Sequence, residues 1–118
     1  MPVSFDTSGS ITSEMVNQFL SEVQNCLKYS ELKECSLWHT STYWYGTPEE
    51  LEKKIEKVYE SGGTYEHCMS DLETHVKADL YVHFSDGEHG GDFGFKHPQK
   101  HIEIIWDGKT IKEIRKGF

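Results

Sequence analysis

The chain has 118 residues, of which 36% are hydrophobic and 13% aromatic, and its formal net charge at pH 7 is −8. This size and composition predict one compact domain over residues 1–118 and exclude a disordered acidic tail. No lysine or arginine cluster offers a surface for a phosphate backbone, and no apolar run approaches the roughly 20 residues of a membrane helix. We therefore expect a cytoplasmic protein that binds neither nucleic acid nor membranes.

Strand and helix patterns alternate along the first part of the chain. An apolar stretch at residues 3–5 indicates a short strand. Apolar side chains at helical spacing over residues 12–28 predict a helix that buries one wide face. Residues 34–39 and 42–46 are rich in Trp, Tyr and Leu, which favours two strands joined by a tight turn.

A capping box introduces the next predicted helix. Thr47 is a favourable N-cap, a proline occupies the first helical position, and Glu50 stands three residues after the cap. We expect this helix to end at the glycine pair Gly62 and Gly63. A third short helix is expected over residues 65–76.

The second half of the chain predicts three more strands. Residues 78–84 alternate apolar and polar side chains and give the strongest strand signal. A loop over residues 87–99 leads to a strand at residues 101–106. An Asp-Gly pair then signals a hairpin, so residues 110–115 should return as an antiparallel edge strand. The alternation of strands and helices predicts an α/β layer fold.

Oxygen-bearing side chains follow three of the predicted elements. Asp6, Ser8 and Ser10 come after the first strand, Thr64 comes after the glycine pair, and Asp86 comes after the strongest strand. If the strands are parallel, these loops meet at one edge of the sheet. An all-oxygen set without thiolates suits a hard divalent cation, magnesium first, with manganese or calcium as alternatives.

Three motifs in this order resemble the metal-ion-dependent adhesion site of von Willebrand factor A (VWA) domains. They are the run Asp6 to Thr12, the run Gly62 to Thr64, and the run Ser85 to Gly87 followed by Gly91-Asp92-Phe93. The chain is most similar to the VWA-like domain associated with bacterial putative metallopeptidases, and the resemblance spans nearly all of it. It implies a compact Rossmann-like VWA fold: a mostly parallel sheet with an antiparallel hairpin and helices on both faces.

The resemblance also implies a role for each residue of the site. Ser8 and Ser10 would bind the cation directly, Thr64 directly or through water, and Asp6 and Asp86 mainly through water. One position would stay open for an Asp or Glu side chain of another protein. The implied function is therefore a metal-dependent protein–protein interaction module and not an enzyme. The candidate rim for the partner consists of His39, Tyr65, Glu88 and His89.

Two other functions stay open at this point. An aspartate directly after a strand, as Asp6 is expected to be, is also the phosphoryl-accepting nucleophile of magnesium-dependent phosphatases. Those enzymes have a DxD motif at this position, whereas this chain has Ser8 as the third residue. The other alternative is a metal-silent adaptor or inhibitor domain, which binds no cation and acts only through its surface.

Histidines and cysteines give weaker signals. His89, Asp92, His97 and His101 lie in or beside one loop, but their spacing matches no standard zinc site, so we expect a solvated polar loop. The three cysteines are widely spaced and form no CxxC pair. We expect them to be small core residues in a reducing compartment.

Overall fold

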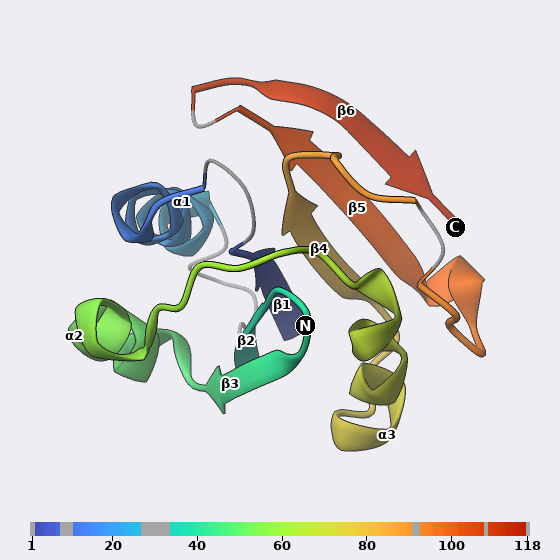
Figure 1. Ribbon diagram of the computed structural model, residues 1–118. Helices are drawn as coiled ribbons and strands as arrows, with labels where there is room; N and C mark the ends of the chain where they lie inside the picture. The colour runs from blue at the N-terminus through green and yellow to red at the C-terminus, as the bar shows by residue number, and fades with distance from the viewer. Residues whose placement is uncertain (1, 8–10, 27–33, 91–92, 108, 118) are drawn as a thin grey trace.

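The computed structural model describes residues 2–7, 11–26, 34–90, 93–107 and 109–117. Six described strands form one sheet in the order β3-β2-β1-β4-β5-β6 (Figure 1). Their bounds are Pro2–Asp6 (β1), Glu34–Trp38 (β2), Thr42–Gly46 (β3), Tyr81–Ser85 (β4), His101–Trp106 (β5) and Ile111–Lys116 (β6). The pairs β1–β2, β1–β4 and β4–β5 are parallel, and β2–β3 and β5–β6 are antiparallel hairpins. The predicted α/β fold with a mostly parallel sheet is confirmed.

The central position of β1 brings distant loops together. Asp6, the last residue of β1, pairs with Trp38, the last residue of β2. On the other side, Phe5 pairs with Phe84, so β4 ends level with β1. The loops that follow these three strands therefore start at the same edge of the sheet, which we call the carboxyl edge.

Helices cover both faces of the sheet (Figure 1). Helices α1 (Ser13–Cys26) and α2 (Pro48–Val58) pack on one face, and the 3-10 helix η1 (Glu66–Asp71) with the short helix α3 (Leu72–His75) packs on the other. The Thr12 hydroxyl accepts a hydrogen bond from the Met15 amide at the start of α1. The predicted capping box of α2 is present, since Thr47 and Glu50 each accept the other's backbone amide.

The two faces differ in chemistry. The face under α1 and α2, here called the apolar face, is built from Val3, Phe5, Leu37, Val82 and Phe84 together with the helices' apolar side chains. The opposite face, here called the polar face, lies under η1, α3 and the segment 93–95. Its buried strand residues include Ser4, Asp6, Ser36, His83, Ser85, His101 and Glu103. Strand alternation places these polar side chains opposite the apolar set.

Helix α2 ends earlier than the glycine pair predicts. Its last residue is Val58, and Tyr59 is extended with φ −65° and ψ 129°. The Tyr59 hydroxyl donates to the backbone carbonyl of Ile11, near the start of α1. This anchor turns the chain out of the helix before Gly62 is reached. The first helix also begins one residue later than predicted, at Ser13, and residues 27 and 28 lie outside the described residues.

The expected helix over residues 65–76 is mostly a 3-10 helix. Only Leu72–His75 is α-helical. Neither Tyr65 nor Asp71 makes a side-chain capping bond at the start of its helix. Met69 and Leu72 are both buried, and their spacing of three suits the three residues per turn of a 3-10 helix.

Strand β4 starts at Tyr81, three residues after the predicted start. The Tyr81 hydroxyl donates to the Val76 carbonyl and accepts from the Ala78 amide at 3.1 Å. These contacts hold residues 76–80 in a turn, and they leave Leu80 39% exposed instead of in the core. Strand β5 has the predicted bounds, and β6 is shifted by one residue from the predicted edge strand.

Candidate cation site at the carboxyl edge of the sheet

Asp6 ends β1 on the polar face and is only 1% exposed. The next residue ties β1 to β2, because the Thr7 amide donates to the Trp38 carbonyl at 2.8 Å. The Thr7 hydroxyl is 3.2 Å from the same carbonyl and 2.9 Å from the Tyr43 hydroxyl. Both the amide and the hydroxyl of Thr7 are therefore hydrogen-bonded to β2 or β3, which fixes the backbone next to Asp6.

The Thr64 loop lies beside the end of β2. The Tyr65 amide donates to the His39 carbonyl at 2.9 Å. A Cβ on Gly62 would come 2.9 Å from His39 Nδ1, so the loop approaches this ring as closely as a glycine allows. Thr64 is half-buried, whereas Tyr65 is 55% exposed. Of the predicted rim residues, Tyr65 therefore lies on the surface, and His39 is half-buried beneath the loop.

Asp86 directly follows β4. Its Oδ1 accepts from the Glu88 amide at 2.9 Å, and Gly87 between them has φ +81°. Its Oδ2 is buried and has no hydrogen-bond partner among the described residues. Asp86 and the exposed Glu88 also line a cavity of about 190 Å³ with Ile11 and Met15 at the start of α1.

A buried carboxylate lies next to these residues. Glu103 of β5 is 0% exposed, and its Oε2 accepts from the Ser85 hydroxyl at 2.7 Å. The same oxygen contacts His89 Nε2, and Arg115 Nη1 is 3.5 Å from Oε1. The side chains of His89 and Glu103 are both completely buried. The expectation of a solvated loop is therefore wrong for His89, because Glu103 supplies a partner inside the protein.

The charges of this cluster stabilise one another. The hydrogen bond with Glu103 raises the pKa of His89 above its ordinary value, against the effect of burial, and the Glu66 and Asp6 carboxylates act in the same direction. Burial alone would raise the pKa of Glu103, but the hydrogen bonds from His89 and Ser85 and the charge of Arg115 lower it. The pair therefore favours an imidazolium next to a carboxylate.

The structure brings some of the predicted site residues to one edge. Asp6, the Thr64 loop and Asp86 follow or adjoin the ends of β1, β2 and β4. Ser8 and Ser10, the two predicted direct ligands, lie outside the described residues. Among the residues that are described, no three His, Cys, Asp or Glu side chains are arranged to hold a metal ion. The predicted site depends on hydroxyl oxygens as well as carboxylates.

The donor chemistry at this edge fits a hard cation. The buried Oδ2 of Asp86 is an anionic oxygen that no described donor satisfies. A buried carboxylate oxygen without a partner is costly, and a divalent cation or its bound water would satisfy it. Asp6 adds a second buried carboxylate at the neighbouring strand end.

The expected solvated surroundings are also wrong for His101, which is fully buried, and Glu103 and His83 were not assigned a role from the sequence. Glu103 and His101 are two residues apart on one strand, as are Ser85 and His83 on the other. This spacing places each pair on the same face of a sheet, which is the signal that could have revealed them.

A second polar chain crosses the sheet farther from this edge. Ser4 Oγ is 2.7 Å from His83 Nδ1, and His83 Nε2 is 2.8 Å from His101 Nδ1. His101 Nε2 is 3.8 Å from Oε2 of Glu73 in α3. Burial lowers the pKa of His83 well below its ordinary value and that of His101 to about 4, so both imidazoles are neutral at pH 7.

No family model, curated protein or solved structure matches this chain. The described residues include no helix that is long and apolar enough to cross a membrane.

Proposed function

We propose that this chain binds one divalent cation, magnesium in the first place, at the carboxyl edge and uses it to dock an acidic side chain of a partner protein. The observation that carries the proposal is the buried Oδ2 of Asp86, which has no hydrogen-bond partner among the described residues and lies at the same sheet edge as Asp6 and the Thr64 loop. The strand order, with β1 between β2 and β4, is in keeping with the Rossmann-like VWA arrangement that the sequence motifs imply.

Asp6, Ser8, Ser10, Thr64 and Asp86 would hold the cation. The cation would supply a positive charge that a partner Asp or Glu can bind. The exposed side chains of Tyr65 and Glu88 lie on the loops that carry Thr64 and Asp86, and under this proposal they would contact the partner. Because the chain carries a net charge of −8, the partner should offer its carboxylate from a neutral or basic surface.

The burial of Asp6 disfavours the hydrolase alternative. A phosphoryl-accepting nucleophile must reach its substrate, and Asp6 is 1% exposed. The described cysteines, Cys35 and Cys68, are free thiols, and burial raises their pKa values to about 12 and about 11. Such thiols are poor nucleophiles, and free cysteines are in keeping with the cytoplasm as the place of action.

Magnesium titration of the protein, by calorimetry and by thermal melting, tests the proposal. At a magnesium concentration 100-fold above the dissociation constant, the folded state should gain about 2.7 kcal/mol, so EDTA should lower the melting temperature. Asp86→Ala should weaken magnesium binding about tenfold or more. Asp79→Ala is the matched control, because Asp79 is an exposed aspartate just before β4, at the opposite edge.

The partner is tested by capture with magnesium and with EDTA, using wild type and Asp86→Ala. Binding that needs magnesium and is lost in Asp86→Ala supports the docking step. If magnesium, manganese and calcium all leave the melting temperature unchanged in wild type, the metal-silent adaptor is the better description. Equal weakening by Asp79→Ala and Asp86→Ala would also contradict the site.

A further inference from the structure

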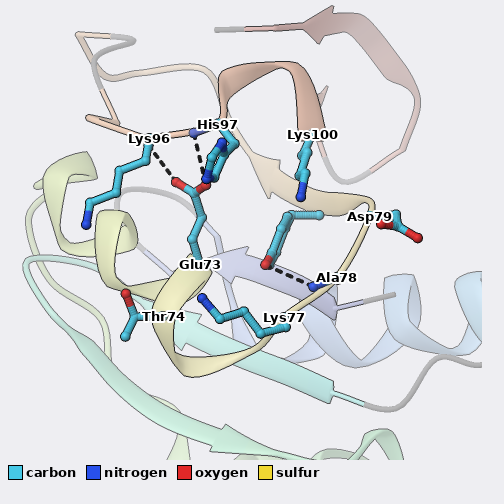
Figure 2. Close-up of a pocket in the computed structure, with 9 residues that line it drawn as sticks. Glu73, Thr74, Lys77, Ala78, Asp79, Lys96, His97 and Lys100 are labelled. Carbon is cyan, nitrogen blue, oxygen red and sulfur yellow. Dashed lines mark hydrogen bonds between the residues drawn. The ribbon is translucent and has the colours of Figure 1, made fainter.

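A pocket of about 520 Å³ lies at the opposite edge of the sheet from the candidate cation site. Tyr81, the first residue of β4, and His97, just before β5, line it. Figure 2 shows this lining of the pocket. Its other walls come from α3, the turn before β4 and the segment that leads into β5. This volume is within the roughly 300–1,000 Å³ typical of small-molecule sites.

Lysines give the pocket a local positive charge. Lys77, Lys96 and Lys100 line it, in a chain that has 12 basic and 20 acidic residues. Within the described part of the chain, none of these three ammonium groups forms an ion pair with a carboxylate. The positive charge is therefore available to a ligand.

The pocket is also lined by two acids, Glu73 and Asp79, and neither pairs with the lysine ammonium groups. Glu73 is 6% exposed, and its two carboxylate oxygens accept from the backbone amides of Lys96 at 2.7 Å and His97 at 3.0 Å. In Figure 2 its carboxylate turns to that backbone, whereas Lys100 points down from the upper side of the pocket and Lys77 runs along its lower side. Asp79 is exposed and points away from them.

The walls of the pocket are fixed by internal bonds. Tyr81 is held through its hydroxyl by the backbone of residues 76 and 78, and its ring stacks on His101 at 4.5 Å. The amide of Lys100 donates to the His97 carbonyl at 3.0 Å. A pocket whose walls are already ordered loses less entropy when a ligand binds.

We propose that this pocket binds a small organic phosphate, with its phosphoryl group between Lys77 and Lys100. A phosphate monoester carries about −1.5 to −2 charges at pH 7, which matches two ammonium groups better than a single carboxylate does. The volume beyond the phosphoryl group leaves room for the organic part beside Tyr81 and Ala78.

Amide NMR titrations with inorganic phosphate, AMP and adenosine, all in EDTA, test the proposal. Inorganic phosphate and AMP should shift the amide signals of Lys96, His97 and Lys100 in a saturable manner, and adenosine should not. The double variant Lys77→Gln/Lys100→Gln should weaken the binding of AMP by about tenfold or more. The control Lys53→Gln/Lys54→Gln changes two exposed lysines of α2 and should bind AMP as wild type does.

The same spectra show whether each variant is folded. The proposal is overturned if neither phosphate probe gives saturable shifts, if adenosine shifts the pocket as AMP does, or if the α2 control weakens binding equally. Since EDTA is present throughout, the result is independent of the proposed cation site.

Discussion

The two faces of the sheet are both buried, yet they serve different purposes. The apolar face packs Val3, Phe5 and Phe84 against two helices and contains the larger apolar core. The polar face buries serines, histidines and acids that bond across β1, β4 and β5. The apolar face therefore supplies most of the hydrophobic stability, while the polar face fixes polar groups close to both candidate sites.

The largest expected effect is on the apolar face. Phe5 is 1% exposed, and its ring lies 5.3 Å from that of Phe84 and 6.4 Å from that of Phe19. Phe5→Ala should lower the free energy of unfolding by about 3–5 kcal/mol, because it removes buried area and leaves a cavity. Denaturant unfolding measures this loss. A loss no larger than that of Ser4→Ala would contradict the claim that the apolar face supplies most of the stability.

The polar face should make the protein sensitive to acid. Unfolded His101 takes up a proton as the pH falls through its ordinary pKa of 6.5, whereas folded His101 does so only near pH 4. The unfolded state therefore binds more protons in this window, and the free energy of unfolding should fall by on the order of 3 kcal/mol between pH 6.5 and 4. His83 acts in the same direction.

Unfolding curves recorded at several pH values check this dependence. His101→Phe should reduce the slope between pH 6.5 and 4, whatever its effect on stability at pH 7, because one titrating group is removed. His75→Gln is the control, since His75 has a side chain that is 44% exposed. An unchanged slope in His101→Phe would show that His101 is not the group responsible.

A smaller effect is expected from the hydrogen bond that starts the polar chain. Ser4→Ala removes the 2.7 Å hydrogen bond between Ser4 Oγ and His83 Nδ1, and both residues are fully buried. The free energy of unfolding should fall by about 1–3 kcal/mol. Ser21→Ala, on the exposed side of α1, is the matched control and should change stability by less. Equal losses from both serines would argue against an organised polar face.

The smallest predicted change lies outside the sheet, at the start of α2. The Thr47 hydroxyl accepts from the Glu50 amide at 3.2 Å, and Thr47→Ala removes this cap. A loss of about 1 kcal/mol is expected in thermal or denaturant unfolding. Thr47→Ser keeps the hydroxyl and should restore most of the stability; failure to do so would assign the loss to the methyl group.

Local patterns predicted much of the fold. The capping box fixed the start of α2, the Asp-Gly pair predicted the β5–β6 hairpin, and alternation predicted β5. The errors arose where a tyrosine side chain bonds to the backbone and overrides the local pattern, once over a long separation and once within five residues. Tyr59 ends α2 by bonding to Ile11, and Tyr81 delays β4 by bonding to residues 76 and 78.

The polar interior was the harder part to predict. Glutamate is usually exposed and histidine is intermediate, and nothing in the spacing of residues 87–101 indicates that Phe93 and Phe95 pack over His83. The parallel pairing of β1 with β2 and β4, on which the expected convergence of the three loops depends, is present, but the convergence of their side chains on one cation stays a prediction. The direct ligands Ser8 and Ser10 stay a prediction.

The place of β1 in the middle of the sheet has a consequence for how the chain acquires its structure. Among the six strands β1 leaves the ribosome first, yet its neighbour β4 is made about 80 residues later, as the Ser4–His83 bond shows with its separation of 79. Parallel pairing over such a distance is slow, and it leaves the edge of β1 that pairs with β4 uncovered after β2 has been made. The nascent chain should therefore reach its compact state late, only once β4 has emerged.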